Sequence, residues 1–143
     1  MSSKQKLVVL LVVVVGGAVV GGLPFARAMH YRIACEKVLN RVAARPSPAA
    51  VFALPEELRK LAAGSGIDPA GVEVRVALRR VGFVEAPAYR LQAYTHHGRW
   101  NDAIVAVVDN DHVSEDYLLE LGRGGVELLG MPEEAALAGQ GEE

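Results

Sequence analysis

The most apolar stretch of the chain lies at its N-terminus. About twenty consecutive residues, from Leu7 to Ala26, carry no charge, and Lys4 and Lys6 precede them. As a helix this stretch would extend for roughly 30 Å, which matches the hydrocarbon core of a bilayer. The pattern predicts a basic N-terminus over residues 1–6 and a transmembrane helix over residues 7–26.

Helical periodicity continues beyond the apolar stretch. Cys35, Val38 and Val42 recur at spacings of three and four residues, and charged residues occupy the other face. Pro46 follows soon afterwards, and the residue before a proline is disfavoured in helical geometry. We therefore expect an amphipathic juxtamembrane helix over residues 27–45 that continues the membrane helix.

Three later segments have the pattern of strands. Over residues 72–79, four large apolar residues at even positions alternate with Glu73, Arg75, Ala77 and Arg79, as required of a sheet with one wet face. Residues 89–95 repeat the alternation, and residues 103–108 are more continuously apolar. Turn-forming residues separate the three segments. The pattern predicts a three-stranded antiparallel sheet with helices packed on one face.

Two short helices are expected beside this sheet. Leu54-Pro55-Glu56-Glu57 has the signals of a helix start, and Ser114 can cap a closing helix that ends near Gly122. A fourth strand after Ser114 is the alternative. The chain is thus expected to be an α+β protein, with a small α+β domain over residues 46–130 and an acidic disordered tail over residues 131–143.

The N-terminal stretch also has the outline of a cleaved signal peptide. Gly21-Gly22-Leu23-Pro24 would break the helix, and Ala26-Arg27-Ala28 offers small residues at the cleavage positions. Cleavage after Ala28 would release a secreted soluble binding domain. The apolar stretch exceeds the roughly 7–15 residues typical of such a peptide, so a retained anchor is the leading interpretation.

The orientation of the predicted anchor rests on its flanking charges. A short basic N-terminus followed directly by an apolar segment is typical of exported chains. This predicts a single-pass protein of the bacterial inner membrane with its domain in the periplasm. The cations Arg27, Arg32 and Lys37 beyond the segment favour the opposite orientation.

Two glycines in the apolar stretch are candidates for contact between membrane helices. Gly17 and Gly21 are four residues apart, a spacing that lets two helices approach closely. Self-association through Gly17 and Gly21 is therefore expected. The alternative is simple composition, because glycine is common in membrane helices.

The formal net charge of −2 conceals an asymmetry along the chain. Residues 29–100 hold eleven Lys or Arg and six Asp or Glu, whereas residues 101–143 hold one Arg and eleven acids. The basic middle suits lipid headgroups, an acidic partner, or simply a solvated surface. We expect membrane lipid and an unidentified envelope protein as partners. No nucleic acid is expected, because the chain lacks a high pI, an aromatic-basic pattern and zinc-finger spacing.

Chemistry-bearing residues are few. His96 and His97 are adjacent, so on a strand they would point to opposite faces. Asp109 and His112 belong to an acid-rich segment that fails the calcium-loop pattern. Cys35 is the only cysteine, which excludes an intramolecular disulfide. One alternative is a small metal-binding protein or enzyme with its site around His96, His97, Asp109 and His112. The other interpretation is structural: the two histidines form a polar hairpin end, and Asp109 and His112 belong to an Asx-rich turn.

No enzyme is predicted. The sequence has neither G-x-S-x-G nor G-x-x-x-x-G-K, and no strand is followed by G-x-G-x-x-G. We therefore predict no catalytic residue, no cofactor and no metal ligand.

The order of elements carries a resemblance over about residues 4–109. The resemblance rests on four features: the apolar stretch ending in Ala26, the helix over residues 29–44, the segment Glu57-Leu58-Arg59-Lys60-Leu61, and Gly66-Ile67-Asp68 leading into Val72-Glu73-Val74. This order resembles small bacterial single-pass, pilin-like membrane proteins of unknown function. Type IV pilins have a Glu at the fifth position of their hydrophobic stretch, and no acid interrupts residues 7–26 here.

The resemblance implies a membrane helix that runs into an exposed helix, followed by a small sheet, and it implies no catalytic residues. The leading hypothesis is a non-catalytic, membrane-anchored interaction or assembly module of the bacterial cell envelope. In this hypothesis the sheet or its exposed edge contacts another protein.

Overall fold

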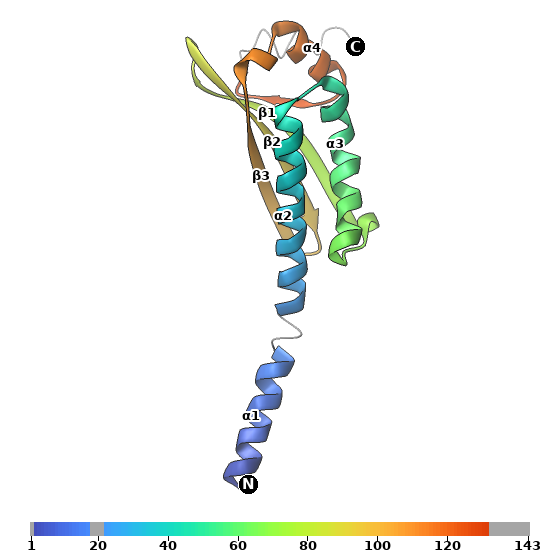
Figure 1. Cartoon of the computed structure of the whole chain (residues 1–143), viewed down its shortest axis with the longest axis vertical. Coiled ribbons are helices and arrows are strands. Elements are labelled where there is room, and N and C mark those ends of the chain that lie inside the picture. The colour runs from blue at the N-terminus through green and yellow to red at the C-terminus, as the bar shows by residue number, and fades with distance from the viewer. Residues whose placement is uncertain (1, 18–21, 132–143) are drawn as a thin grey trace.

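The computed structural model describes residues 2–17 and 22–131. Within these residues, helices cover one face of a four-stranded sheet (Figure 1). In chain order the elements are α1 (Ser3–Gly17), α2 (Leu23–Ala44), α3 (Pro48–Leu61), the 3₁₀ helices η2 (Ala62–Ser65) and η3 (Pro69–Gly71), β1 (Val72–Phe83), β2 (Ala86–His97), β3 (Trp100–Val108), the 3₁₀ helix η4 (Asn110–His112), α4 (Glu115–Arg123) and β4 (Glu127–Leu129).

The apolar N-terminal stretch does not form one long helix in the described chain. Its first part lies in α1, at the end of the molecule away from the sheet (Figure 1), and its last part begins α2. The 15 residues of α1 extend for about 22 Å, less than the roughly 30 Å of a bilayer core. α2 is longer, but it carries Arg27, Arg32 and Lys37.

The predicted transmembrane helix over residues 7–26 is therefore wrong. Among residues 2–17 and 22–131, no helix is both long enough and apolar enough to cross a membrane. The interpretation as a single-pass, signal-anchored protein of the bacterial inner membrane, with its domain in the periplasm, depends on that helix and is corrected with it. Membrane lipid as a partner is not tested by this finding and stays a prediction.

α2 forms where the helical periodicity predicts a helix. Tyr31, Cys35, Leu39 and Val42 are buried at spacings of four, four and three residues, so they form one stripe that faces the sheet. α2 ends at Ala44, before Pro46.

α3 begins at the second proline of the Pro46-Ser47-Pro48 segment and continues through Pro55, so the helix start expected at Leu54-Pro55 is wrong. The Ser47 hydroxyl caps it by accepting a hydrogen bond from the Ala50 amide at 3.3 Å, with Pro48 in the first turn. Val51, Leu54 and Leu58 form the buried side of the helix.

The sheet is mixed, with strand order β3-β2-β1-β4. β1 pairs with β2 and β2 with β3 in antiparallel fashion, whereas β4 runs parallel to β1. The predicted sheet of three antiparallel strands is thus wrong in its strand number and in its type. β4 has only three residues and lies just after Gly124 and Gly125, which leaves too short a segment for alternation to be recognised.

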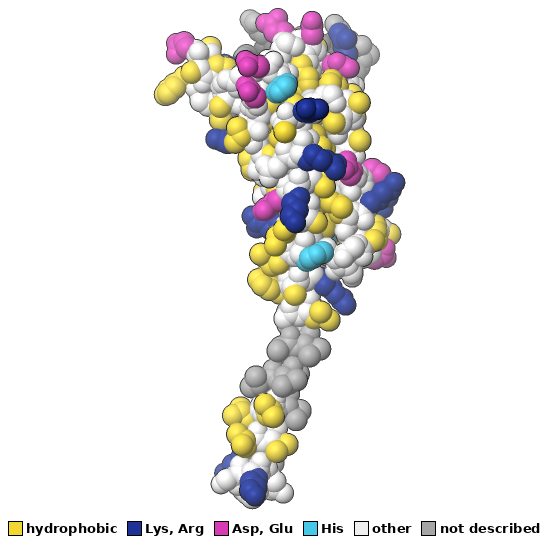
Figure 2. All heavy atoms as spheres, viewed as in Figure 1, with side chains coloured by type: hydrophobic (Ala, Val, Ile, Leu, Met, Phe, Trp, Pro, Cys, Tyr) yellow, Lys and Arg dark blue, Asp and Glu magenta, His cyan; other side chains and the backbone are white. Residues whose placement is uncertain are grey.

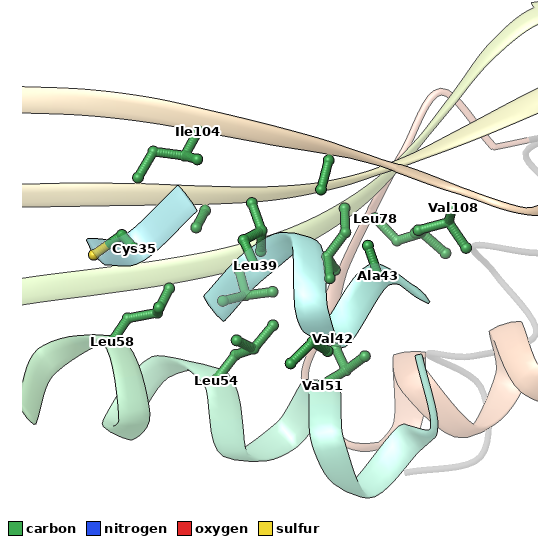
Figure 3. Packing of buried hydrophobic residues seen from close by; sticks show 14 of the residues in the cluster. Cys35, Leu39, Val42, Ala43, Val51, Leu54, Leu58, Leu78, Ile104 and Val108 are labelled. Atoms are coloured by element: carbon green, nitrogen blue, oxygen red, sulfur yellow. The ribbon is translucent and has the colours of Figure 1, made fainter. Parts of the chain in front are cut away.

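The core lies between the sheet and the two helices α2 and α3 (Figure 3). Leu39, Leu54 and Leu58 from the helices meet Leu78 and Ile104 from the strands, and all five side chains are buried. This burial of apolar surface is the main stabilising term of the fold.

Two polar side chains of α2 lie in the same core. The Tyr31 hydroxyl donates a hydrogen bond to the Leu58 carbonyl at 2.8 Å, which ties α2 to α3. Cys35 is fully buried beside it, and this burial raises the pKa of the thiol to about 11. Cys35 is therefore a packing residue with little thiolate at neutral pH.

We expect Leu54→Ala to lower the free energy of unfolding by about 2–5 kcal/mol, because it removes a fully buried side chain and leaves a cavity. Val107→Ala is the matched control, since Val107 is 66% exposed and should change stability by less than about 0.5 kcal/mol. Urea denaturation followed by circular dichroism measures both. Equal losses in the two variants would contradict the assigned core.

Candidate functional site

The sheet has a second face, which points away from α2 and α3 and which we call the open face. The two helices lie on the opposite side of the sheet (Figure 1). Successive residues of a strand point to alternate sides, and this assigns the open face. It comprises Glu73, Arg75, Ala77, Arg79 and Val81 of β1, Ala88, Arg90, Gln92, Tyr94 and His96 of β2, Asn101, Ala103, Val105 and Val107 of β3, and Glu127 and Leu129 of β4.

Arginines stand at the centre of the open face. Arg79 lies directly opposite Arg90 in the register of β1 and β2, an arrangement of like charges that destabilises a sheet. Arg79 Nε donates to Gln92 Oε1 at 3.4 Å, and the same oxygen accepts from the Tyr94 hydroxyl at 2.5 Å. The Arg75 guanidinium lies over the Tyr94 ring, 5.1 Å from its centroid. These contacts hold the side chains of Arg79 and Arg75 in place beside Arg90.

Apolar side chains flank the arginines on β3. Val105 is 48% exposed and Val107 is 66% exposed. Val107 lies opposite Arg90 in the register, so apolar and cationic surface are adjacent. Within the described chain β3 pairs with β2 alone, so this strand forms one edge of the sheet.

A depression of about 720 Å³ lies at the end of the open face near the turn between β2 and β3. Glu73, Arg75, Tyr94, His96 and Asn101 contribute to its lining. Small-molecule sites are lined mainly by apolar side chains, whereas protein interfaces are enriched in Tyr and Arg. The lining of the depression is mixed, with Arg75 and Tyr94 beside the acidic Glu73 and Asp102.

Charge is distributed unevenly on the helix side of the molecule. Asp and Glu side chains gather at the end that carries α4, and Lys and Arg side chains are spread along α2 and α3 (Figure 2). This is the asymmetry between a basic middle and an acidic C-terminal third that the sequence predicts.

The structure places the two adjacent histidines on opposite faces of β2. His96 lies on the open face, and its Nδ1 is 2.5 Å from Asn101 Oδ1. His97 is buried on the helix side, where its ring meets the edge of Tyr31 at a centroid distance of 5.5 Å. Its Nε2 is buried and has no hydrogen-bond partner among the described residues. Burial lowers the pKa of His97, with the charge of Asp102 opposing the shift.

The second group of candidate ligands lies elsewhere. Asp109 immediately precedes η4, and His112 is the last residue of η4. Asp109 Oδ1 accepts a hydrogen bond from the Asp111 amide at 3.1 Å, as in the expected Asx turn. The nine residues of β3 separate this turn from His97, a span of about 30 Å. In the described part of the chain, no group of three His, Cys, Asp or Glu side chains is placed to hold a metal ion. The structure therefore does not bring the two histidines together with Asp109 and His112.

The glycine pair proposed for helix contact lies at the limit of the described residues. Gly17 is the last residue of α1, and Gly21 lies outside the described residues. Self-association through this pair stays a prediction.

Two features were not predicted from the sequence. β1 and β2 are longer than expected, and residues 80–88 form a two-stranded hairpin that extends beyond both β3 and β4. The alternation of Val81 with Phe83 was the signal for the longer strand. The second feature is a pocket beside β1, formed by residues from α3 and from the segment before β4.

Comparison with known proteins finds no matching family model, no matching curated protein and no matching solved structure. The resemblance to pilin-like proteins therefore stays a prediction, and the site is interpreted from its own geometry.

We expect the protein to lose stability as the pH falls below about 6.5, partly through His97. The unfolded chain binds a proton near the ordinary pKa of 6.5, whereas the buried imidazole resists protonation, so acid favours the unfolded state. His97→Gln should flatten the fall of melting temperature between pH 7.5 and 5. His112→Gln, at an exposed position, is the control and should keep the parental slope. Equal slopes in all three proteins would contradict this role of His97.

Proposed function

We propose that this chain is a non-catalytic protein-binding module whose open face binds an acidic, partly apolar segment of a partner protein. The observation that carries the proposal is the opposed pair Arg79 and Arg90 beside the exposed Val105 and Val107. The repulsion between the two arginines and the exposure of the two valines are both unfavourable in water. A partner segment with acidic and apolar residues would reduce both costs.

The electrostatic half of the argument concerns the arginine pair. Opposed like charges cost a sheet roughly 0.2–1 kcal/mol relative to neutral residues. Gln92 accepts from Arg79 but is itself neutral, so it leaves the repulsion between Arg79 and Arg90 in place. A carboxylate between the two guanidinium groups would pair with both, and Arg–carboxylate pairs are among the stronger hydrogen bonds of proteins.

The apolar half concerns β3. Val105 and Val107 stand on the same side of an edge strand, so a bound segment can cover both valines while its acids reach Arg90. Tyr94 and Arg75 extend this surface toward the depression, and such residues often dominate binding energy at interfaces. The proposal therefore includes a partner segment that alternates apolar and acidic residues.

A non-catalytic role fits the contacts of the polar groups. On the open face, His96 contacts Asn101, and Gln92 accepts from both Arg79 and Tyr94. These contacts order a surface and activate no nucleophile. The secreted form released after Ala28 stays an alternative; cleavage there would remove the first turn and a half of α2, including Phe25, which contacts the Trp100 ring at 6.0 Å.

The test uses the full chain and two matched sets of synthetic peptides. One set combines Val or Leu with Glu, and the other replaces every Glu by Gln. We expect binding of Glu peptides alone, weakened by salt because exposed charges are screened. Arg79→Gln together with Arg90→Gln should weaken that binding about tenfold or more, whereas Arg59→Gln on α3 should leave it unchanged.

A stability measurement separates a binding role of the pair from a structural one. Because the two charges repel, Arg90→Gln should keep or raise the free energy of unfolding while it weakens peptide binding. Loss of stability with unchanged binding would contradict the proposal. So would equal affinity for the Gln peptides, or tighter binding of a single-stranded oligonucleotide than of any Glu peptide.

A further inference from the structure

The hairpin formed by residues 80–88 projects from the sheet as an arm. β3 pairs with β2 only as far as Tyr89, and β4 pairs with β1 only over three residues ending at Arg79. At the tip, Phe83 is 79% exposed and Val84 is 80% exposed. Figure 2 shows hydrophobic side chains at the end of this arm. Isolated two-stranded hairpins are marginally stable, so this arm needs support at its base. Its exposed apolar tip also needs a structural explanation.

The base of the arm is firmly supported. Asn110 Nδ2 donates to the Pro87 carbonyl on one strand. On the other strand, Gly130 lies so close to Arg80 that a Cβ at position 130 would stand 2.4 Å from the Arg80 carbonyl oxygen. The Arg80 guanidinium also donates to the Val84 carbonyl at 3.3 Å, which holds the turn. The tip is thus presented on a braced support.

A pocket of about 290 Å³ lies beside the opposite half of β1. It is lined by Val51, Phe52 and Pro55 of α3 and by Val76 and Val126, with Arg75 and Glu127 also contributing. Its volume lies just below the roughly 300–1,000 Å³ of small-molecule sites and suits one or two apolar side chains.

The outer side of β1 is unpaired next to this pocket. In the described chain, β4 pairs only with Ala77, Leu78 and Arg79, so residues 72–76 have no strand neighbour on that side. The pocket therefore combines an apolar hollow with a stretch of strand edge that no described strand covers, the two elements that recognise an extended segment by strand addition.

We propose that the arm tip of one copy of this chain, led by Phe83, inserts into the α3–β1 pocket of a second copy. The charges around the two surfaces are complementary. Glu85 at the tip would meet Arg75 at the pocket rim, and Arg80 would meet Glu127. Within one copy, Arg75 and Glu127 are 4.0 Å apart, with their side chains 71% and 47% exposed, so both can turn to a neighbour.

The arm of one copy cannot reach the pocket of the same copy. Phe83 and Val76 lie on the same strand, seven residues apart, which corresponds to about 23 Å. A braced strand cannot fold back over that distance. A contact that joins different surfaces of identical copies repeats from copy to copy and builds an open chain or a closed ring. The contact shares Arg75 and Glu127 with the open face, but its arm tip, residues 83–85, takes no part in the binding proposed there.

The area involved predicts a weak contact. A buried Phe contributes about 150–250 Å², whereas stable interfaces bury about 1,200–2,000 Å² in total. The association is therefore reversible, and trapping it covalently is the suitable test.

The trap is the full chain with Val84→Cys and Val126→Cys together. Head-to-tail contacts then yield a ladder of disulfide-linked species on non-reducing gels, because each copy offers one tip cysteine and one pocket cysteine. The native Cys35 is buried and does not compete. The matched control combines Val84→Cys with Ala63→Cys, an exposed position in η2, just beyond the end of α3. An equal ladder in the control overturns the proposal.

Substitutions in the trapped background test the contact itself. Phe83→Asp should reduce the ladder about tenfold, and Ile33→Asp, at an exposed site on α2, should leave it unchanged. Glu85→Arg should weaken the ladder, and Arg75→Glu should restore it in the double variant. Circular dichroism checks that each variant is folded. A ladder that persists in Phe83→Asp, or association that persists without any ladder, assigns the contact to another surface such as α1 and overturns the proposal.

Discussion

The structure depends on the burial of two helices against a single face of the sheet. Leu39 of α2 and Leu54 and Leu58 of α3 bury their side chains on the strand residues of that face, and Tyr31 joins the helices through its hydrogen bond to Leu58. This burial fixes which side of every strand is apolar. It also leaves the other side of the sheet to hold whatever polar or functional surface the chain requires, which is where Arg79 and Arg90 stand opposed.

The elements with strong local signals could be predicted from the sequence. The alternation from Val72 onward identifies β1, the spacing of buried residues identifies α2 up to Ala44, and Ser114 caps α4 by accepting from the Tyr117 amide at 3.1 Å. Each of these depends on residues close together in the chain. The α+β class follows from them, because alternating strands with one apolar face need helices to cover it.

The remaining features depend on contacts between distant residues. β4 forms because three residues pair with the edge of β1. Nothing in the sequence Glu127-Leu128-Leu129 itself specifies a parallel strand. The apolar N-terminal stretch is predicted as one continuous helix because no charge interrupts it, whereas its described residues lie in two helices, α1 and α2.

The candidate site was missed for a related reason. Arg79 lies opposite Arg90 because of the register set by the turn at Val84 and Glu85. These two positions hold neither the glycine nor the asparagine that is typical of a tight hairpin turn, so the sequence does not indicate this register. A shift of one residue in that turn would move one arginine to the helix side. Sequence reasoning identified a basic middle region but had no means of pairing its charges.

The parallel pairing of β4 with β1 has a consequence for synthesis of the chain. Ala77 pairs with Glu127, so the ribosome must add 127 − 77 = 50 further residues before the partner of this part of β1 exists. At translation rates of about 5–20 residues per second, that interval lasts roughly 3 to 10 s. During it, β1 and β2 can already form their hairpin, while the outer backbone of Leu78 stays open to any other strand nearby. The last described strand to be made therefore covers only three residues of the β1 edge, and residues 72–76 stay without a described strand neighbour on that side even in the finished chain.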